Sequence, residues 1–257
     1  MKSLQNHTPK ILLLISIATF LAVFIGMQPL EQDLHYHSFA NDNSVFGIAN
    51  GWNVLSNIGF ILCGIFGFQL IVKHNIKSII IWALFIGIFL TGLGSAYYHY
   101  HPNNQTLVWD RLPMTIVFTA FFAQLYSWYF SEKTAFYIWI ASLVIGIFSV
   151  SYWQYTESIG KGDLRLYAIV QFLPMLLILA ILFIHSNKNS FLWKPLSMVI
   201  IWYIIAKFLE HYDQELFILT NTLSGHPFKH IAASIATFYI VLMVKKQAIS
   251  EKEYLNI

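Results

Sequence analysis

Residues 92–114 read GLGSAYYHYHPNNQTLVWDRLPM, and they contain the end of one apolar segment and the beginning of the next. The first segment ends with Ser95 and His99 one helical turn apart, and the second opens with Asp110 after a short polar loop. Far downstream, residues 224–230 (SGHPFKH) open the last apolar segment. We expect these two pieces to meet at one membrane face and to build a three-histidine metal site.

The composition of the chain indicates a membrane protein. Of its 257 residues 57% are hydrophobic and only 11% are charged, whereas a soluble domain carries about 25% charged residues. The net charge of +3 is small and forms no basic stripe, which excludes nucleic acid as an expected partner. The single cysteine, Cys63, excludes an internal disulfide and a cysteine-based zinc cage.

Apolar segments of spanning length divide the chain into eight predicted transmembrane helices, since a span needs ~20 mostly apolar residues. Residues 11–27 form the first, and we favour an uncleaved anchor helix over a signal peptide because no small-residue cleavage site follows it. The eighth segment is clear, whereas the seventh is the weakest because Lys207 and Glu210 interrupt its end. The seven further spans are predicted at about residues 54–72, 78–98, 112–130, 134–152, 166–184, 196–209 and 228–244.

The basic residues between the spans predict an orientation. With the N-terminus in the cytoplasm, ten lysines fall inside and five basic residues fall outside, which is the asymmetry that the positive-inside rule predicts. Both termini are then cytoplasmic, and His99, Asp110, His226 and His230 all lie near the outer face. We expect one integral membrane domain over residues 1–257. The lysines expected inside are Lys2, Lys10, Lys73, Lys77, Lys133, Lys188, Lys194, Lys245, Lys246 and Lys252.

Three histidines are the candidate metal ligands. His226 and His230 are spaced i, i+4, so both imidazoles project from one helix face, although such a pair alone is also typical of interfacial histidines bonded to water. A third imidazole completes the ligand count of a catalytic zinc, which keeps its fourth position open. We prefer His99 to His101 for this third position, because His99 lies one turn after Ser95.

The charged residues near these histidines allow two interpretations each. Asp110 is either an N-cap or dipole partner of a helix starting near residue 112, or an acid/base beside the metal. Lys207, Glu210 and Asp213 recur every three residues, and we favour ordinary ion pairs at a helix end over a stripe that faces the metal cavity. For the more distant charges, the sequence predicts solvated loop positions: Glu157, Asp163 and Arg165.

Four blocks in this order resemble the alkaline ceramidases: residues 53–57 (NVLSN), Gly94-Ser95-x3-His99, residues 109–114 (WDRLPM) and His226-x3-His230. That family belongs to a superfamily of seven-span membrane hydrolases that includes the adiponectin-receptor-like proteins. The resemblance covers about residues 50–244 and implies an all-α fold: a seven-helix membrane core, preceded here by one additional N-terminal helix. It further implies three zinc-binding histidines, matching His99, His226 and His230, assisted by a serine and an aspartate, matching Ser95 and Asp110.

The resemblance therefore predicts a zinc-dependent amidase that cleaves the N-acyl bond of a ceramide-like lipid with a long acyl chain. The acidic calcium site of animal members does not transfer cleanly, because Asn50 replaces the expected glutamate, which speaks against calcium regulation. Two other functions stay open at this point. One is a membrane receptor or ligand-binding protein with a structural zinc, and the other is a transporter or channel, which would spread polar residues across the bilayer depth.

Overall fold

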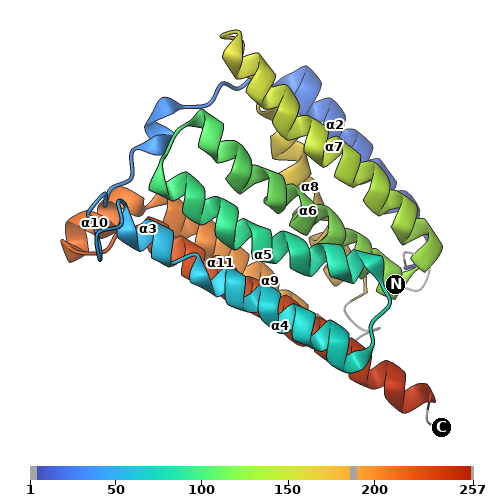
Figure 1. Ribbon diagram of the computed structural model, residues 1–257. Helices are drawn as coiled ribbons and strands as arrows, with labels where there is room; N and C mark the ends of the chain where they lie inside the picture. The colour runs from blue at the N-terminus through green and yellow to red at the C-terminus, as the bar shows by residue number, and fades with distance from the viewer. Residues whose placement is uncertain (1–4, 186–189, 256–257) are drawn as a thin grey trace.

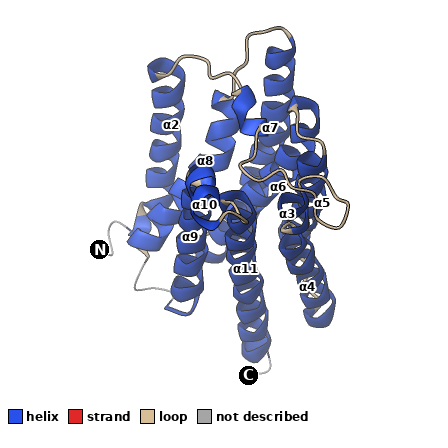
Figure 2. Ribbon diagram, turned by 90° about the vertical axis from the view of Figure 1, so that its left-hand side faces the viewer, coloured by secondary structure: helices blue, strands red, loops and turns tan. Residues whose placement is uncertain are grey.

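The computed structural model describes residues 5–185 and 190–255, and this part of the chain consists of helices joined by loops (Figure 2). The prediction of an all-α fold is confirmed. Lys2 and Lys188, two of the lysines in the orientation count, lie outside the described residues. The helices are α2 (Thr8–Gly26), the 3-10 helix η1 (Leu34–His37), α3 (Gly51–Leu55), α4 (Ile58–His74), α5 (Ile79–Tyr100), α6 (Asn104–Tyr129), α7 (Glu132–Ser158), α8 (Arg165–Ile184), α9 (Ser190–His211), α10 (Asp213–Thr220) and α11 (Gly225–Leu255).

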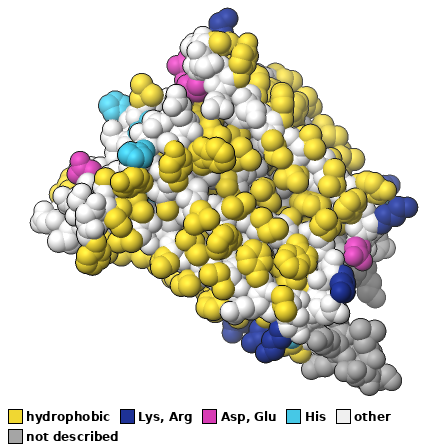
Figure 3. Space-filling model, in the orientation of Figure 1, with side chains coloured by type: hydrophobic (Ala, Val, Ile, Leu, Met, Phe, Trp, Pro, Cys, Tyr) yellow, Lys and Arg dark blue, Asp and Glu magenta, His cyan; other side chains and the backbone are white. Residues whose placement is uncertain are grey.

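Eight helices in the described part of the chain are long and apolar enough to cross a membrane, with α3 and α4 together forming one span. Apolar side chains cover the face of the molecule in Figure 3, and charged side chains gather toward its two ends. The additional N-terminal helix α2 packs mainly on α8 and leaves Leu13 60% and Leu14 65% exposed. Such exposed apolar surface is expected where lipid replaces water, so the chain is a multi-pass membrane protein.

Six helices form a ring in the order α4, α5, α6, α8, α9 and α11, which closes because α11 packs against α4. Helix α7 packs outside this ring against α6 and α8. Successive spans alternate in direction, so α2 begins and α11 ends at one end of the bundle, while α3, α10 and the loop after α2 lie at the other (Figure 1). We call this second end the site end, because the candidate residues lie there.

Helix α6 begins eight residues earlier than residue 112, where its span was predicted to start. Asn103 caps it by accepting the backbone N–H groups of Gln105 and Thr106, while the Thr106 hydroxyl accepts the Asn103 N–H. This capping box stabilises a polar first turn that hydropathy alone does not detect. Asp110 therefore lies in the second turn, and its interpretation as an N-cap is wrong.

A close approach between α5 and α6 sets the relative position of the candidate residues. Pro113 lacks an N–H, so the carbonyl of Trp109, four residues earlier, has no donor there in the helix ladder. Gly94 of α5 faces that carbonyl, and a Cβ at residue 94 would collide with it. Because the two backbones meet at this point, Ser95 on α5 is brought beside Asp110 on α6.

The loop after α2 lies across the site end, and we call residues 30–43 the covering segment. Backbone and side-chain hydrogen bonds attach it to four parts of the bundle: Leu164 N–H to the Leu30 carbonyl (2.8 Å), Gln32 N–H to Glu157 Oε1 (2.6 Å), His37 Nε2 to Asn104 Oδ1 (2.8 Å) and Ala40 N–H to Asp213 Oδ2 (3.1 Å). The segment is therefore a fixed cover rather than a free linker.

Of the three charges predicted to be solvated, Glu157 bonds this cover directly, whereas Asp163 and Arg165 flank Leu164, whose N–H donates to the Leu30 carbonyl. Glu157 accepts from the Gln32 backbone and from the Trp153 indole, and Asp163 forms an ion pair of 2.8 Å with Arg165. The Asp163 side chain is only 3% exposed, and the Arg165 guanidinium beside it holds the pKa of that carboxyl below its usual range. The prediction of solvated positions was wrong because hydropathy does not reveal these hydrogen bonds and this ion pair, which keep the three side chains partly or fully buried.

Candidate metal centre

The structure brings together the three histidines that the sequence selected. His99 near the end of α5 and His226 and His230 in the first two turns of α11 are 1%, 5% and 3% exposed. Each offers one ring nitrogen, and these atoms lie within 4.8 Å of one another. His101, the competing candidate, is exposed at the end of α5 and is not part of the group. Among the described residues this is the one cluster of histidine, cysteine and carboxylate groups with the spacing of a metal site.

The orientation of two rings fits a bound cation. The Ser56 hydroxyl forms a hydrogen bond of 2.8 Å with Nδ1 of His230. The other ring nitrogen of His230, Nε2, then faces Nε2 of His99 at 3.2 Å. Two zinc-bound nitrogens at about 2.05 Å from a tetrahedral ion would be separated by about 3.3 Å. The observed spacing thus matches one edge of such a site, and the Ser56 contact is the type of outer partner that fixes a ligand's tautomer.

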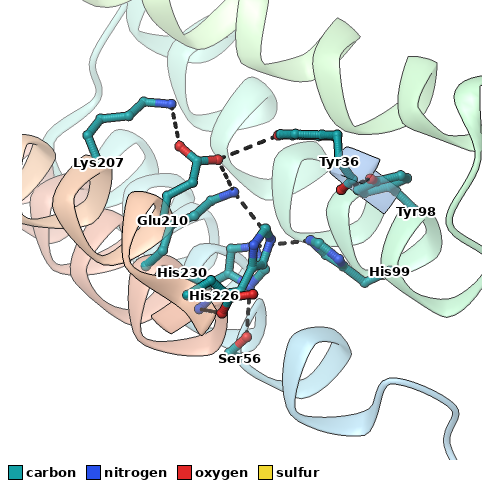
Figure 4. A network of polar contacts seen from close by, with 10 residues as sticks. Tyr36, Ser56, Tyr98, His99, Lys207, Glu210, His226 and His230 are labelled. Atoms are coloured by element: carbon teal, nitrogen blue, oxygen red, sulfur yellow. Dashed lines mark hydrogen bonds and ion pairs between the residues drawn. The ribbon is translucent and has the colours of Figure 1, made fainter. Parts of the chain in front are cut away.

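Charged groups lie beside the third ring. Lys229 Nζ lies 3.3 Å from His226 Nε2 and 2.7 Å from Glu210 Oε1, and Lys207 Nζ lies 2.7 Å from Glu210 Oε2 (Figure 4). The predicted pair between Lys207 and Glu210 is therefore present. The alternative, that these charges face the cavity beside the metal site, holds for Lys207 and Glu210 as well, because both line the cavity described below. Glu210 offsets the positive charge of two lysines next to a site that would take a cation.

Asp213 has a different role from the two residues with which it was grouped. Its Oδ1 accepts the backbone N–H of His226 at 2.6 Å, and its Oδ2 accepts that of Ala40. Asp213 thus caps the N-terminus of α11 and ties the covering segment to it. Ser224, the residue before α11 and of a type that often caps helices, has a buried hydroxyl with no hydrogen-bond partner in the described part of the chain. A carboxylate from α10 replaces it, as suits the positive end of a helix.

Ser95 and Asp110 lie on the same cavity wall as His230. Their exposed fractions are 3% and 8%, and the Ser95 hydroxyl hydrogen-bonds to the Asp110 carboxylate. The structure therefore places all five predicted site residues at the site end, as the alternating topology required. A carboxylate at this depth of a membrane protein is rare without a functional reason.

A cavity of about 290 Å³ runs from these residues into the ring of six helices. Polar side chains line its site end, including Tyr36, Asp110, Arg111, Glu210 and Lys229. Its deeper wall is apolar, and His230 and Ile240 are ten residues apart along α11, which corresponds to about 15 Å. Among the deeper residues are Phe121, Met175, Val199, Ala236 and Ile240.

The covering segment closes the site end of this cavity. The Phe39 ring lies 4.7 Å from the His99 ring and 4.8 Å from the His226 ring, between centroids. The Tyr36 hydroxyl donates to Glu210 Oε1 at 3.5 Å, and burial together with the Glu210 charge raises the pKa of Tyr36, so the hydroxyl stays protonated. Sequence reasoning missed Phe39, Tyr36 and Ser56, since no spacing rule connects a loop residue to histidines far along the chain.

Comparison with known proteins agrees with the order of these motifs. A family model described as Ceramidase matches residues 43–255, which include α3 to α11 and exclude α2 and nearly all of the covering segment. No match to a curated protein is found.

Proposed function

The chain belongs to the ceramidase family, and we propose that it is a zinc-dependent membrane amidase. Its reaction would be hydrolysis of the N-acyl bond of a ceramide-like lipid, giving a free fatty acid and a long-chain amine. The observation that carries this proposal is a cluster of three buried histidines, one of which, His230, lines the polar end of a cavity whose other end is mostly apolar.

His99, His226 and His230 would hold Zn²⁺, because three neutral imidazoles are a frequent ligand set of catalytic zinc. When bound, zinc acts as a Lewis acid toward a carbonyl and lowers the pKa of a water molecule to about 7. The carboxylates at the site end are not needed as ligands and stay available for proton transfer.

Asp110 is the proposed acid and base. Its carboxylate takes a proton as the oxygen of water attacks the acyl carbon, and it returns that proton to the amine nitrogen as the C–N bond breaks. Ser95 hydrogen-bonds to Asp110 and orients the carboxylate, or donates to the oxyanion that develops on the former carbonyl. The Lys229 ammonium adds positive charge on the same side of the cavity.

The deeper part of the cavity would take the acyl chain. Its walls are apolar over about 15 Å along α11, and the covering segment with Phe39 separates the histidines from water. A lipid would then enter sideways from the bilayer. The positive-inside count favours cytoplasmic termini and a site near the outer leaflet, and α2 would act as an additional anchor outside the family-matched core.

Metal content and fatty-acid release, measured on the same purified protein, test the proposal. We expect one zinc per chain, release of fatty acid from an N-acyl lipid, and loss of that release on chelation with recovery on adding zinc. His99→Ala should lose both metal and release. His101→Ala, which changes an exposed histidine two residues away, should retain both. A metal-free protein with full activity, or stoichiometric zinc in His99→Ala, would contradict the proposal.

A further inference from the structure

Arg111, the residue after Asp110, is buried at the polar end of the cavity and forms no ion pair with a carboxylate of the described residues. It is only 6% exposed, and it lines the cavity. Its Nη2 donates to Gln32 Oε1 at 2.5 Å, and its guanidinium lies over the rings of Trp153 (4.1 Å) and Tyr167 (4.8 Å). These contacts hold the guanidinium in one orientation.

The other terminal nitrogen, Nη1, is buried and has no hydrogen-bond partner within the described ranges. None of the ion pairs found there involves Arg111. An arginine side chain stays charged at every relevant pH, and a buried charge is stable only when it is paired and hydrogen-bonded. Asp110 attracts it but hydrogen-bonds to Ser95. The described residues therefore supply no hydrogen-bond acceptor for Nη1.

The charges that line the cavity leave a positive excess. The lining includes the cations Arg111, Lys207 and Lys229 against the carboxylates Asp110 and Glu210, a difference of three minus two. Glu210 is already paired with both lysines. A bound divalent cation would increase the excess. The polar end of the cavity is thus suited to a ligand that carries negative charge.

We propose that Arg111 binds an anionic headgroup of the lipid substrate, a phosphate, sulfonate or carboxylate close to the scissile amide. This inference rests on the proposed hydrolysis and narrows its substrate class from neutral ceramide-like lipids to anionic ones. The planar fork of donors on arginine matches such oxyanions, and pre-orientation by Gln32, Trp153 and Tyr167 leaves Nη1 to donate. With the acyl chain in the apolar end, the headgroup lies at the end where Arg111 is located.

The competing explanation is that Arg111 only anchors the covering segment through Gln32. That role accounts for Nη2 and for the two stacked rings, but it does not account for Nη1 or for the charge excess. The two explanations differ in what they predict for ligands. A structural anchor affects neutral and anionic lipids equally, whereas a headgroup site affects only the anionic ones.

Equilibrium binding to the purified full-length protein separates these explanations. The probes are an N-acyl amino alcohol, its phosphate ester with the same acyl chain, an N-acyl aminosulfonate and inorganic phosphate. We expect the wild type to bind the two anionic lipids at least tenfold more tightly than the neutral one. Arg111→Gln should weaken anionic binding by about 10- to 100-fold and neutral binding by less than about threefold, the range for a hydrogen bond to a charged group.

Two further variants guard against loss of folding. Arg111→Lys keeps the charge and should keep part of the anionic preference, and Gln32→Ala removes the covering-segment contact and should keep most of it. Equal affinity of the wild type for neutral and anionic lipids overturns the proposal, as does an equal loss of both in Arg111→Gln. Tight Arg111-dependent binding of inorganic phosphate without preference between the lipids would assign the site to a free anion and overturn the headgroup assignment.

Fatty-acid release from the same lipids distinguishes the failure of this inference from the failure of the proposed function. Arg111-dependent binding without any release would retain the anion site and reject the hydrolase. If neutral and anionic lipids are hydrolysed at the same rate, and Arg111→Gln leaves both rates unchanged, the hydrolase would be retained and the anion site rejected.

Discussion

The two ends of the cavity differ in almost every physical respect. At the site end, residues from α5, α6, α9 and α11 and from the covering segment place charged and hydrogen-bonding groups within a few ångströms of three imidazoles. In the deeper part, the lining residues are mostly apolar and lie about two to three turns further along α5, α6, α9 and α11, together with residues of α4 and α8. One set of helices thus builds both environments.

The difference indicates a division of tasks along one axis of the molecule. The proposed hydrolysis needs charged groups in fixed positions, and the site end supplies them. Protein partners must stabilise these charges, because contact with lipid alone would not. Retention of a long chain needs only apolar area, since burial contributes roughly 25 cal/mol per Å² without directional contacts. Substitutions at the two ends should therefore change different measurable quantities.

Asp110→Asn should show the largest effect and should be confined to the site end. Replacing the proposed base by a neutral isostere is expected to lower hydrolysis by about 10²- to 10⁴-fold. Zinc content and acyl-chain preference should stay as in the wild type, because Asp110 is not a ligand. Asn103→Asp, a change at the cap of the same helix, is the matched control and should leave the rate nearly unchanged. Full activity of Asp110→Asn would contradict the proposed role of Asp110 as acid and base at the site end.

Ser56→Ala tests the support of a ligand without touching the reaction itself. The hydroxyl holds Nδ1 of His230, and loss of such an outer partner typically lowers metal affinity by about 10- to 100-fold. Competition with a zinc-buffering chelator measures this shift, and saturating zinc should restore the activity. Ser151→Ala, an exposed serine on α7, serves as the control. An unchanged zinc affinity would mean that Ser56 has only a packing role.

Gly94→Ala affects the contact that joins the proposed catalytic residues of α5 and α6. The added Cβ would meet the Trp109 carbonyl, so the two helices must separate, at a cost of about 1–3 kcal/mol. We expect a lower melting temperature and reduced hydrolysis with unchanged chain-length preference. Gly26→Ala has open space around the new methyl group and should not reduce stability. Equal melting temperatures of the two variants would contradict the close approach.

Ala236→Phe should change only the apolar end. The larger ring would occupy the part of the cavity that we assign to the acyl chain, and hydrolysis of long-chain lipids should fall by about tenfold relative to short-chain ones. Zinc content should stay at the wild-type level. Ile231→Phe, on a half-exposed face of the same helix outside the cavity lining, is the control. A uniform loss for every chain length would break the proposed division.

Asp163→Asn should have the smallest effect, on the loop between α7 and α8, where Leu164 bonds the Leu30 carbonyl. Because the pKa of Asp163 is lowered in the folded protein, its ion pair with Arg165 contributes stability above the unfolded pKa of about 3.9. This contribution is lost as the pH falls through the lowered value. At pH 7 we expect a loss of up to about 1 kcal/mol, seen as a small decrease in melting temperature. The difference from wild type should vanish in strong acid, and its persistence there would exclude the ion pair as the cause.

Much of the fold follows from hydropathy, which locates the spans. The alternating direction of successive spans then assigns each loop to one end of the bundle or the other. The number of spans is confirmed, and His99, Asp110, His226 and His230 lie at one end as predicted. The start of α6 was misplaced because its first turn is polar and is stabilised by the Asn103 capping box rather than by lipid. The ligand and catalytic roles of the five site residues stay predictions.

The remaining features of the site depend on tertiary contacts that have no local signal. Arg111 and Lys229 are two of the five basic residues expected outside, yet Arg111 is buried and the Lys229 side chain is only 18% exposed, because residues from other helices surround them. Asp213 shares the three-residue spacing of Lys207 and Glu210, but it belongs to a separate helix and caps another. Phe39 contacts His99 and His226 across 60 and 187 positions of the chain, and no periodicity connects such distant residues.

The Phe39 contact has a practical consequence for where this enzyme unit should be taken to begin. The family-matched region starts at residue 43, after the aromatic ring that shields two imidazoles and after the amide of Gln32 that supports Arg111. A chain shortened to begin at residue 43 would keep every proposed ligand, but water would reach the histidines from the side that Phe39 covers. The working length of the protein therefore exceeds the family-matched region.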